Sequence, residues 1–130
     1  MIVLDASVVV ELLMNSVLAG TIRSELSGRN DRWAAPHLLD IEVTSALRRL
    51  SVSQRVDAHR CAAFLDGLAL FPADRYDHAP LLGRVWELRY NFTSNDAAYI
   101  ALAEVTGSVL FTCDEKLRRG HRARVVVFNH

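Results

Sequence analysis

The chain has 130 residues, about the length of one domain, and half of them are hydrophobic, which argues against an intrinsically disordered protein. Its 15 Lys and Arg residues balance its 15 Asp and Glu residues, so no overall field draws it to nucleic acid or to an anionic membrane. Asp5 and Glu11 interrupt the apolar start of the chain, which disfavours a signal peptide or a membrane span. Cys61 and Cys113 are isolated in the sequence and suggest free thiols. We therefore expect a cytoplasmic protein.

Apolar runs and helical patterns alternate along the whole chain. Residues 2–4 form a short apolar run that predicts the first and central strand, and a helix capped at Asp5 follows it to about residue 13. The other predicted strands are residues 32–35, 69–72, 108–112 and 125–128, and the other predicted helices are residues 17–26, 36–50, 53–68, 77–90 and 97–105. This order predicts one α/β domain over residues 1–130, with three α/β/α layers and a mostly parallel sheet of about five short strands.

Two aspartates mark the ends of one helix-then-strand unit, residues 94–115. Asp96 falls in the first turn of a helix with Ser94 or Asn95 as its N-cap, and Gly107 ends that helix. Asp114 follows the next strand and opens a charged segment that can begin another helix. In a parallel sheet the helix starts near the carboxyl end of the preceding strand, so Asp96, Asp114 and Asp5 are expected at one edge. That edge is where α/β folds bind ligands.

Glu42 is the least ordinary residue of the helix predicted over residues 36–50. At 100° per residue it falls inside the apolar face, between Leu38 and Ala46. A buried carboxylate is costly unless it is paired or bound to a metal. Two readings stay open for the acidic residues: Glu42 can pair with Arg49, and each of the three aspartates can cap or charge-complement a helix.

Four carboxylates in one pocket repel one another unless a cation neutralises them. Oxygen ligands without a nearby His or Cys suit Mg²⁺ or Mn²⁺, and such a site suits phosphodiester hydrolysis. Two hydroxyl groups, those of Ser7 and Thr112, are candidates to bind a phosphate or a ligand water, or else act as cap and strand-end hydroxyls. Arg118 and Arg119 are candidates to meet substrate phosphates, an acidic partner protein, or only solvent. The motifs of nucleotide-binding loops, serine hydrolases and zinc proteases are absent.

Four motifs together resemble the PIN-domain family, and specifically its VapC-type toxins of toxin–antitoxin pairs. They are IVLDAS at the start, IEVTSALRR around Glu42, NDAAYIALAE from Asn95, and LFTCDEKL around Asp114, and they cover essentially the whole chain.

The resemblance implies that Asp5, Glu42, Asp96 and Asp114 hold Mg²⁺ or Mn²⁺ and catalyse endoribonuclease cleavage of single-stranded RNA regions. It also implies a homodimer and a cognate VapB-type antitoxin whose C-terminal segment covers the site. Ser7 and Thr112 match the small hydroxyl positions of the family.

Three rival functions are weighed against this hypothesis. The alternative is a catalytically inactive PIN-like module that binds RNA or protein, and it predicts binding that survives neutralisation of the carboxylates. A receiver-type signalling domain needs an Asp after an internal strand, which residues 69–72 do not provide. A haloacid dehalogenase phosphatase needs two aspartates spaced by one after the first strand, and Asp5-Ala6-Ser7 has one.

Overall fold

A computed structural model describes residues 1–130 and contains one five-stranded sheet in which every neighbouring pair of strands is parallel. The strands are β1 (Ile2–Leu4), β2 (Trp33–Pro36), β3 (Ala73–Tyr76), β4 (Val109–Thr112) and β5 (Arg124–Val127). The helices are α1 (Ala6–Met14), α2 (Val17–Ser27), α3 (Leu38–Val52), α4 (Ala58–Ala69), α5 (Leu82–Glu87) and α6 (Ser94–Thr106), with 3₁₀ turns η1 (Ala79–Leu81) and η2 (Glu115–Arg118). The predicted α/β class and parallel sheet are confirmed.

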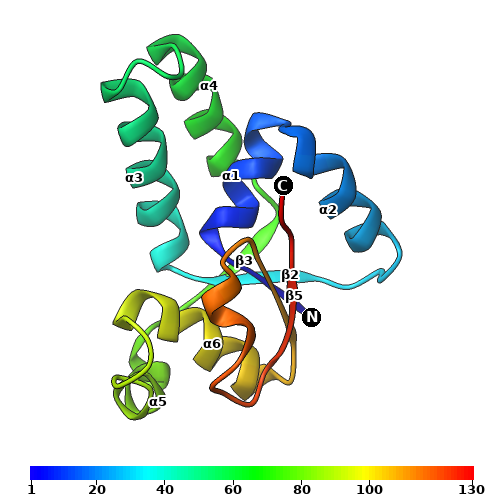
Figure 1. Cartoon of the computed structure of the whole chain (residues 1–130), viewed down its shortest axis with the longest axis vertical. Coiled ribbons are helices and arrows are strands. Elements are labelled where there is room, and N and C mark those ends of the chain that lie inside the picture. The colour runs from blue at the N-terminus through cyan, green and yellow to red at the C-terminus, as the bar shows by residue number, and fades with distance from the viewer.

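Helices cover both faces of the sheet (Figure 1). Helix α1 packs against α2, α3, α4 and strand β4, while α6 packs against α5 and strands β1, β2 and β4. Across the sheet the strand order is β3-β2-β1-β4-β5, so the chain moves outward in one direction from β1 and in the other from β4. The order therefore reverses between β1 and β4, and the crevice outside the carboxyl ends of these strands is the expected ligand position.

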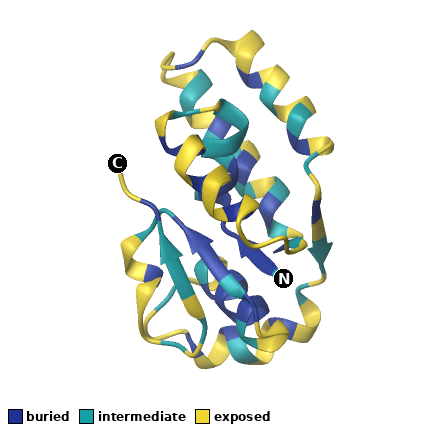
Figure 2. Cartoon of the chain, turned by 90° about the vertical axis from the view of Figure 1, so that its right-hand side faces the viewer, coloured by how far each residue is buried: buried dark blue, intermediate teal, exposed yellow.

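The core lies where the strands meet these helices, and Figure 2 shows the central strands buried while the outer helix faces are exposed. All three residues of β1 are buried, as expected for a parallel strand covered on both faces. Helix α6 is buried at every position from Ala97 to Ala103, and its many alanines let it lie close to the sheet. Gly107 ends α6 with a φ of 65°, a left-handed conformation that favours glycine.

The third strand lies later in the chain than its predicted position. Residues 69–72 were predicted as a strand, but α4 continues to Ala69 and β3 is Ala73–Tyr76. This strand lies at the sheet edge, where polar residues are tolerated. Its Arg75 donates hydrogen bonds to Asp40 and to the carbonyls of Leu68 in α4 and Phe71 just beyond it. The apolar Phe71 packs instead beside Trp33, with ring centroids 5.5 Å apart.

Helix starts also differ from the prediction. Pro36, expected in the first turn of a helix, is the last residue of β2, and α3 begins at Leu38, whose N–H donates to Nε2 of His78. The helix predicted from residue 53 begins at Ala58, after a turn, with Asp57 as its N-cap. The helix predicted over residues 77–90 is divided into η1, which contains Pro80, and the short α5.

No helix is by itself long and apolar enough to cross a membrane, and α1 with α2 reaches that length and apolarity only as a pair bent by 111°.

Candidate active site

Asp5 lies at the switch point of the sheet and is joined to its neighbours by two hydroxyl groups. Its Oδ2 accepts hydrogen bonds from Thr112 Oγ1 at 2.7 Å and from Ser7 Oγ at 2.9 Å, whereas its Oδ1 accepts none. Ser7 Oγ in turn accepts from the N–H of Cys113, and Thr112 Oγ1 from the N–H of Asp114. These bonds tie the end of β1, the start of α1 and the end of β4 into one unit.

Burial makes Asp5 an unusual carboxylate. The residue is 7% exposed, and this burial raises the pKa of its carboxyl from 3.8 to about 6, although the hydrogen bonds from Thr112 and Ser7 lower it. The negative charges of Glu42 and Asp96 raise the pKa of Asp5 further, so both carboxylates lie near it. Asp5 is the N-cap residue of α1, as predicted, but its side chain makes no capping hydrogen bond and binds the hydroxyls of Ser7 and Thr112 instead.

Asp96 lies in the first turn of α6, near Asp114. Thr93 is the N-cap of α6, with its side chain accepting from the Asp96 N–H at 3.2 Å, so the predicted caps Ser94 and Asn95 are wrong. Burial raises the pKa of the Asp96 carboxyl, and the charge of Asp114 adds to that rise.

Glu42 projects from the half-buried side of α3 toward the start of α6. Its Oε2 accepts a hydrogen bond from Asn95 Nδ2 at 3.2 Å, across 53 residues of sequence. Glu42 forms no ion pair, so the predicted partner Arg49 is wrong. Asn95 is therefore a contact of the site that the sequence analysis missed; its only local signal is its position directly before Asp96.

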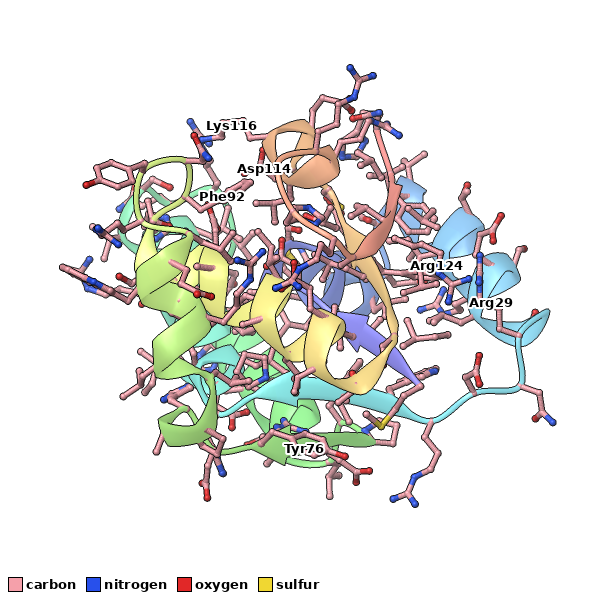
Figure 3. All side chains as sticks on the ribbon, turned by 90° about the horizontal axis from the view of Figure 1, so that it is seen from below. Arg29, Tyr76, Phe92, Asp114, Lys116 and Arg124 are labelled. Atoms are coloured by element: carbon pink, nitrogen blue, oxygen red, sulfur yellow. The ribbon has the colours of Figure 1, made fainter.

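Asp114 also caps η2, because its Oδ1 accepts from the Lys116 N–H at 2.9 Å. Its capping reading is confirmed, and it lies on the site edge as well. Figure 3 shows Asp114 and Lys116 beside Phe92, whereas Arg124 lies well away from them near Arg29.

The two arginines predicted to meet substrate lie in or just after η2. Arg118 donates to Glu115 through Nη2 at 3.1 Å, and Arg119 is exposed. The substrate contacts predicted for Arg118, Arg119, Ser7 and Thr112 stay predictions. Thr112 is fully buried. In the structure the hydroxyl groups of Thr112 and Ser7 both donate hydrogen bonds to Asp5.

The donor chemistry of the quartet, defined as Asp5, Glu42, Asp96 and Asp114, fits a hard divalent cation. Its carboxylates lie at one edge, and the raised pKa values of Asp5 and Asp96 reflect burial and repulsion that a cation would relieve. The nearby thiol of Cys113 has a pKa that burial raises to about 11, so it stays protonated. In the observed side-chain conformations, no three His, Cys, Asp or Glu side chains are arranged to hold a metal ion. The residue types fit, and the ligand oxygens have to approach one another for binding.

Comparisons with known proteins find relatives in sequence and in fold. The model of the PIN domain matches residues 2–122. Ribonuclease VapC1 of Mycobacterium tuberculosis is 39% identical over 121 residues, which are 88% of this chain and 86% of that protein. Ribonuclease VapC12 of the same organism is 36% identical over 93% of this chain and 92% of its own length. The VapBC2 structure of Rickettsia felis, bound to a promoter DNA fragment, has a TM-score of 0.72 at 18% identity, covering 98% of this chain and 99% of the matched chain, and shows the shared fold.

Proposed function

The chain belongs to the PIN-domain family, and from this premise we propose that it is a VapC-type endoribonuclease toxin that hydrolyses RNA phosphodiester bonds. Full-length relatives with the name ribonuclease support the reaction class. The observation that carries the proposal is the gathering of the quartet at the β1–β4 switch point, where an α/β sheet binds its ligand.

We further propose that the quartet holds Mg²⁺ or Mn²⁺. Once bound, such an ion neutralises the carboxylates, polarises the scissile phosphate and lowers the pKa of water. Asp5 presents Oδ1 for this purpose, since the hydroxyls of Ser7 and Thr112 fix Oδ2 and so orient the carboxylate. Asp96 and Asp114 flank the same edge from α6 and η2, and Glu42 closes it from α3.

The proposal also specifies the substrate and the bond that is cleaved. Single-stranded RNA regions are the substrate class, and hydrolysis proceeds by attack of water on phosphorus with departure of one ribose oxygen. Arg118 and Arg119 lie four and five residues after Asp114 and supply positive charge for phosphates that flank the cut. Because Arg118 is engaged by Glu115, Arg119 is the better placed of the two for a phosphate.

The test is cleavage of end-labelled single-stranded RNA by the purified protein, free of any antitoxin, with Mg²⁺, Mn²⁺ or excess chelator. Asp96→Asn should slow cleavage by more than the roughly 10–100-fold that changes around metal ligands cost, while its circular dichroism and melting temperature stay native. Asp66→Asn, on the exposed side of α4, is the control and should cut like wild type. Cleavage that persists in chelator and in Asp96→Asn would refute the proposal.

An antitoxin, a homodimer and a cytoplasmic setting complete the proposal. VapBC2 of Rickettsia felis and a toxin–antitoxin complex of Klebsiella pneumoniae share this fold, which supports an antitoxin partner that covers the site. Exposed apolar side chains such as Ile41, Trp86 and Val105, each at least 66% exposed, supply surface for a second copy. Light scattering at micromolar concentration should give twice the chain mass.

The rival function is a catalytically inactive RNA- or protein-binding module, and it needs no approach of the quartet oxygens around a metal ion. It predicts RNA binding that is equal in wild type and Asp96→Asn, with no cleavage by either. Filter binding of the same labelled RNAs, run beside the cleavage assay, separates the two functions.

A further inference from the structure

Tyr99 carries a polar group that the fold leaves unpaired. It lies on α6 three residues after Asp96 and is fully buried. Its hydroxyl has no hydrogen-bond partner, a condition it shares among buried side-chain polar atoms only with Ser16 Oγ. Buried polar groups in native proteins are nearly always bonded, and each exception calls for an explanation. Packing alone does not provide one, because phenylalanine fills the same space without an unpaired hydroxyl.

Tyr99 lies near members of the quartet. Burial raises the pKa of its hydroxyl, and the charges of Glu42 and Asp5 together with a polar contact to the Glu42 side chain raise it further. The Glu42 carboxylate therefore lies near the hydroxyl, without the geometry of a hydrogen bond. The hydroxyl is therefore a donor with a carboxylate acceptor nearby. Ser16 is the N-cap residue of α2, a helix that carries no member of the quartet, so the two unpaired groups belong to different elements.

Glu42 is the acceptor that lacks a second donor. It accepts one side-chain hydrogen bond, from Asn95 on α6. Asn95 and Tyr99 are four residues apart and so lie on one face of α6, with Asp96 between them in sequence. Asp5 already has two hydroxyl donors, Ser7 and Thr112, which fix its orientation. Glu42 has no comparable pair unless Tyr99 completes it.

We propose that Tyr99 is a positioning residue of the site, whose buried hydroxyl donates to the Glu42 carboxylate and, with Asn95, holds it toward Asp5 and Asp96. The proposal rests on the function proposed above and adds to it the device that orients the one quartet member borne by α3. Tyr99 itself touches neither metal nor substrate. Second partners of this kind fix the direction of a ligand oxygen, and their loss commonly weakens metal binding 10–100-fold.

The test is Tyr99→Phe, which keeps the ring and removes only the hydroxyl. Mn²⁺ binding, measured by titration calorimetry on the whole chain, should weaken at least about 10-fold. The melting temperature in chelator should stay equal to that of wild type or rise, because the variant no longer buries an unpaired hydroxyl. Tyr76→Phe, at a half-buried tyrosine of β3 whose hydroxyl meets Met1 Sδ, is the matched control and should bind Mn²⁺ like wild type.

The outcomes distinguish failure of the proposed role of Tyr99 from failure of the nuclease proposal. Equal Mn²⁺ affinity in wild type and Tyr99→Phe overturns the role of Tyr99, while loss of cleavage in Asp96→Asn still upholds the nuclease. A lower melting temperature of Tyr99→Phe in chelator also overturns it, since the hydroxyl would then stabilise the fold without a metal. Absence of Mn²⁺ binding by wild type refutes both. Asn95→Ala, an exposed change that removes the other donor to Glu42, should weaken Mn²⁺ binding in the same direction.

Discussion

Replacing Asp5 by Asn should make the protein more stable while it abolishes cleavage. In the folded chain the carboxyl of Asp5 has a pKa of about 6 instead of 3.8, and each pKa unit corresponds to about 1.4 kcal/mol. Ionised Asp5 therefore costs the fold about 3 kcal/mol near pH 7.5. Asn keeps the shape and an acceptor oxygen for Ser7 and Thr112, but its uncharged oxygen accepts more weakly, by about 1 kcal/mol. A net gain of about 1–2 kcal/mol is expected.

The gain should depend on pH in a defined direction. Because folding raises the pKa of Asp5, its contribution to stability is fully present below about pH 3.8 and is lost as the pH rises through about 6. Wild type and Asp5→Asn should therefore have nearly equal unfolding free energies near pH 4. Their difference should open between pH 4 and pH 6 and be complete at pH 7.5.

Urea unfolding in excess chelator, followed by tryptophan fluorescence at pH 4.5 and pH 7.5, measures this difference. Asp66→Asn, at an exposed carboxylate of α4, is the control and should change the unfolding free energy by less than about 0.5 kcal/mol at either pH. Added Mn²⁺ should narrow the gap at pH 7.5, since only wild type gains binding energy. The reasoning is refuted if Asp5→Asn is less stable than wild type at pH 7.5, or if its gain is the same at both pH values.

Two further predictions concern the frame of the site. Gly107→Ala should lower the unfolding free energy by about 1 kcal/mol because the φ of Gly107 is 65°, although no atom lies within 4 Å of the added carbon. Gly20→Ala, at an equally open position inside α2, should raise the unfolding free energy by up to about 1 kcal/mol. Thermal melts of both variants measure the two changes. Glu104→Gln should cost about 1–2 kcal/mol in urea unfolding at pH 7.5, since Arg84 and the Arg122 N–H bind the carboxylate at 2.7 Å. Although burial raises the pKa of Glu104, these bonds lower it more, so the cost should fade as the pH drops through and below 4.5. A Gln variant that is equally destabilised at pH 3.5 and pH 7.5 would contradict the ionic explanation.

The parts of the fold that were predictable from sequence are those where local pattern and burial agree. Strand β1 is a run of three apolar residues followed by a charge, and in the structure it is the fully buried centre of the sheet. Strand β3 was not predictable in the same way, because its sequence Ala-Asp-Arg-Tyr is polar. It forms a strand because β2 lies beside it and because Arg75 meets Asp40, which is 35 residues distant.

The same distinction holds for the candidate site. The position of Asp5, Asp96 and Asp114 at one edge follows from the order of strands and helices, which is a regular property of parallel sheets. The partners of these carboxylates do not follow from it. Helix geometry favoured Arg49 as the partner of Glu42, yet the contact is Asn95 on another helix, because α3 and α6 meet at the edge only in the folded chain.

Three unsatisfied groups of the molecule lie where a ligand would satisfy them. Asp5 and Asp96 have raised pKa values, and the Tyr99 hydroxyl is buried without a partner, all beside the switch point of the sheet. Elsewhere buried charge is matched, as Arg84 matches Glu104. A fold selected for stability alone would replace Asp5 by Asn and Tyr99 by Phe at little steric cost. Retaining both groups lowers the stability of the metal-free chain, and under the function proposed above a bound cation would offset this local cost at the site.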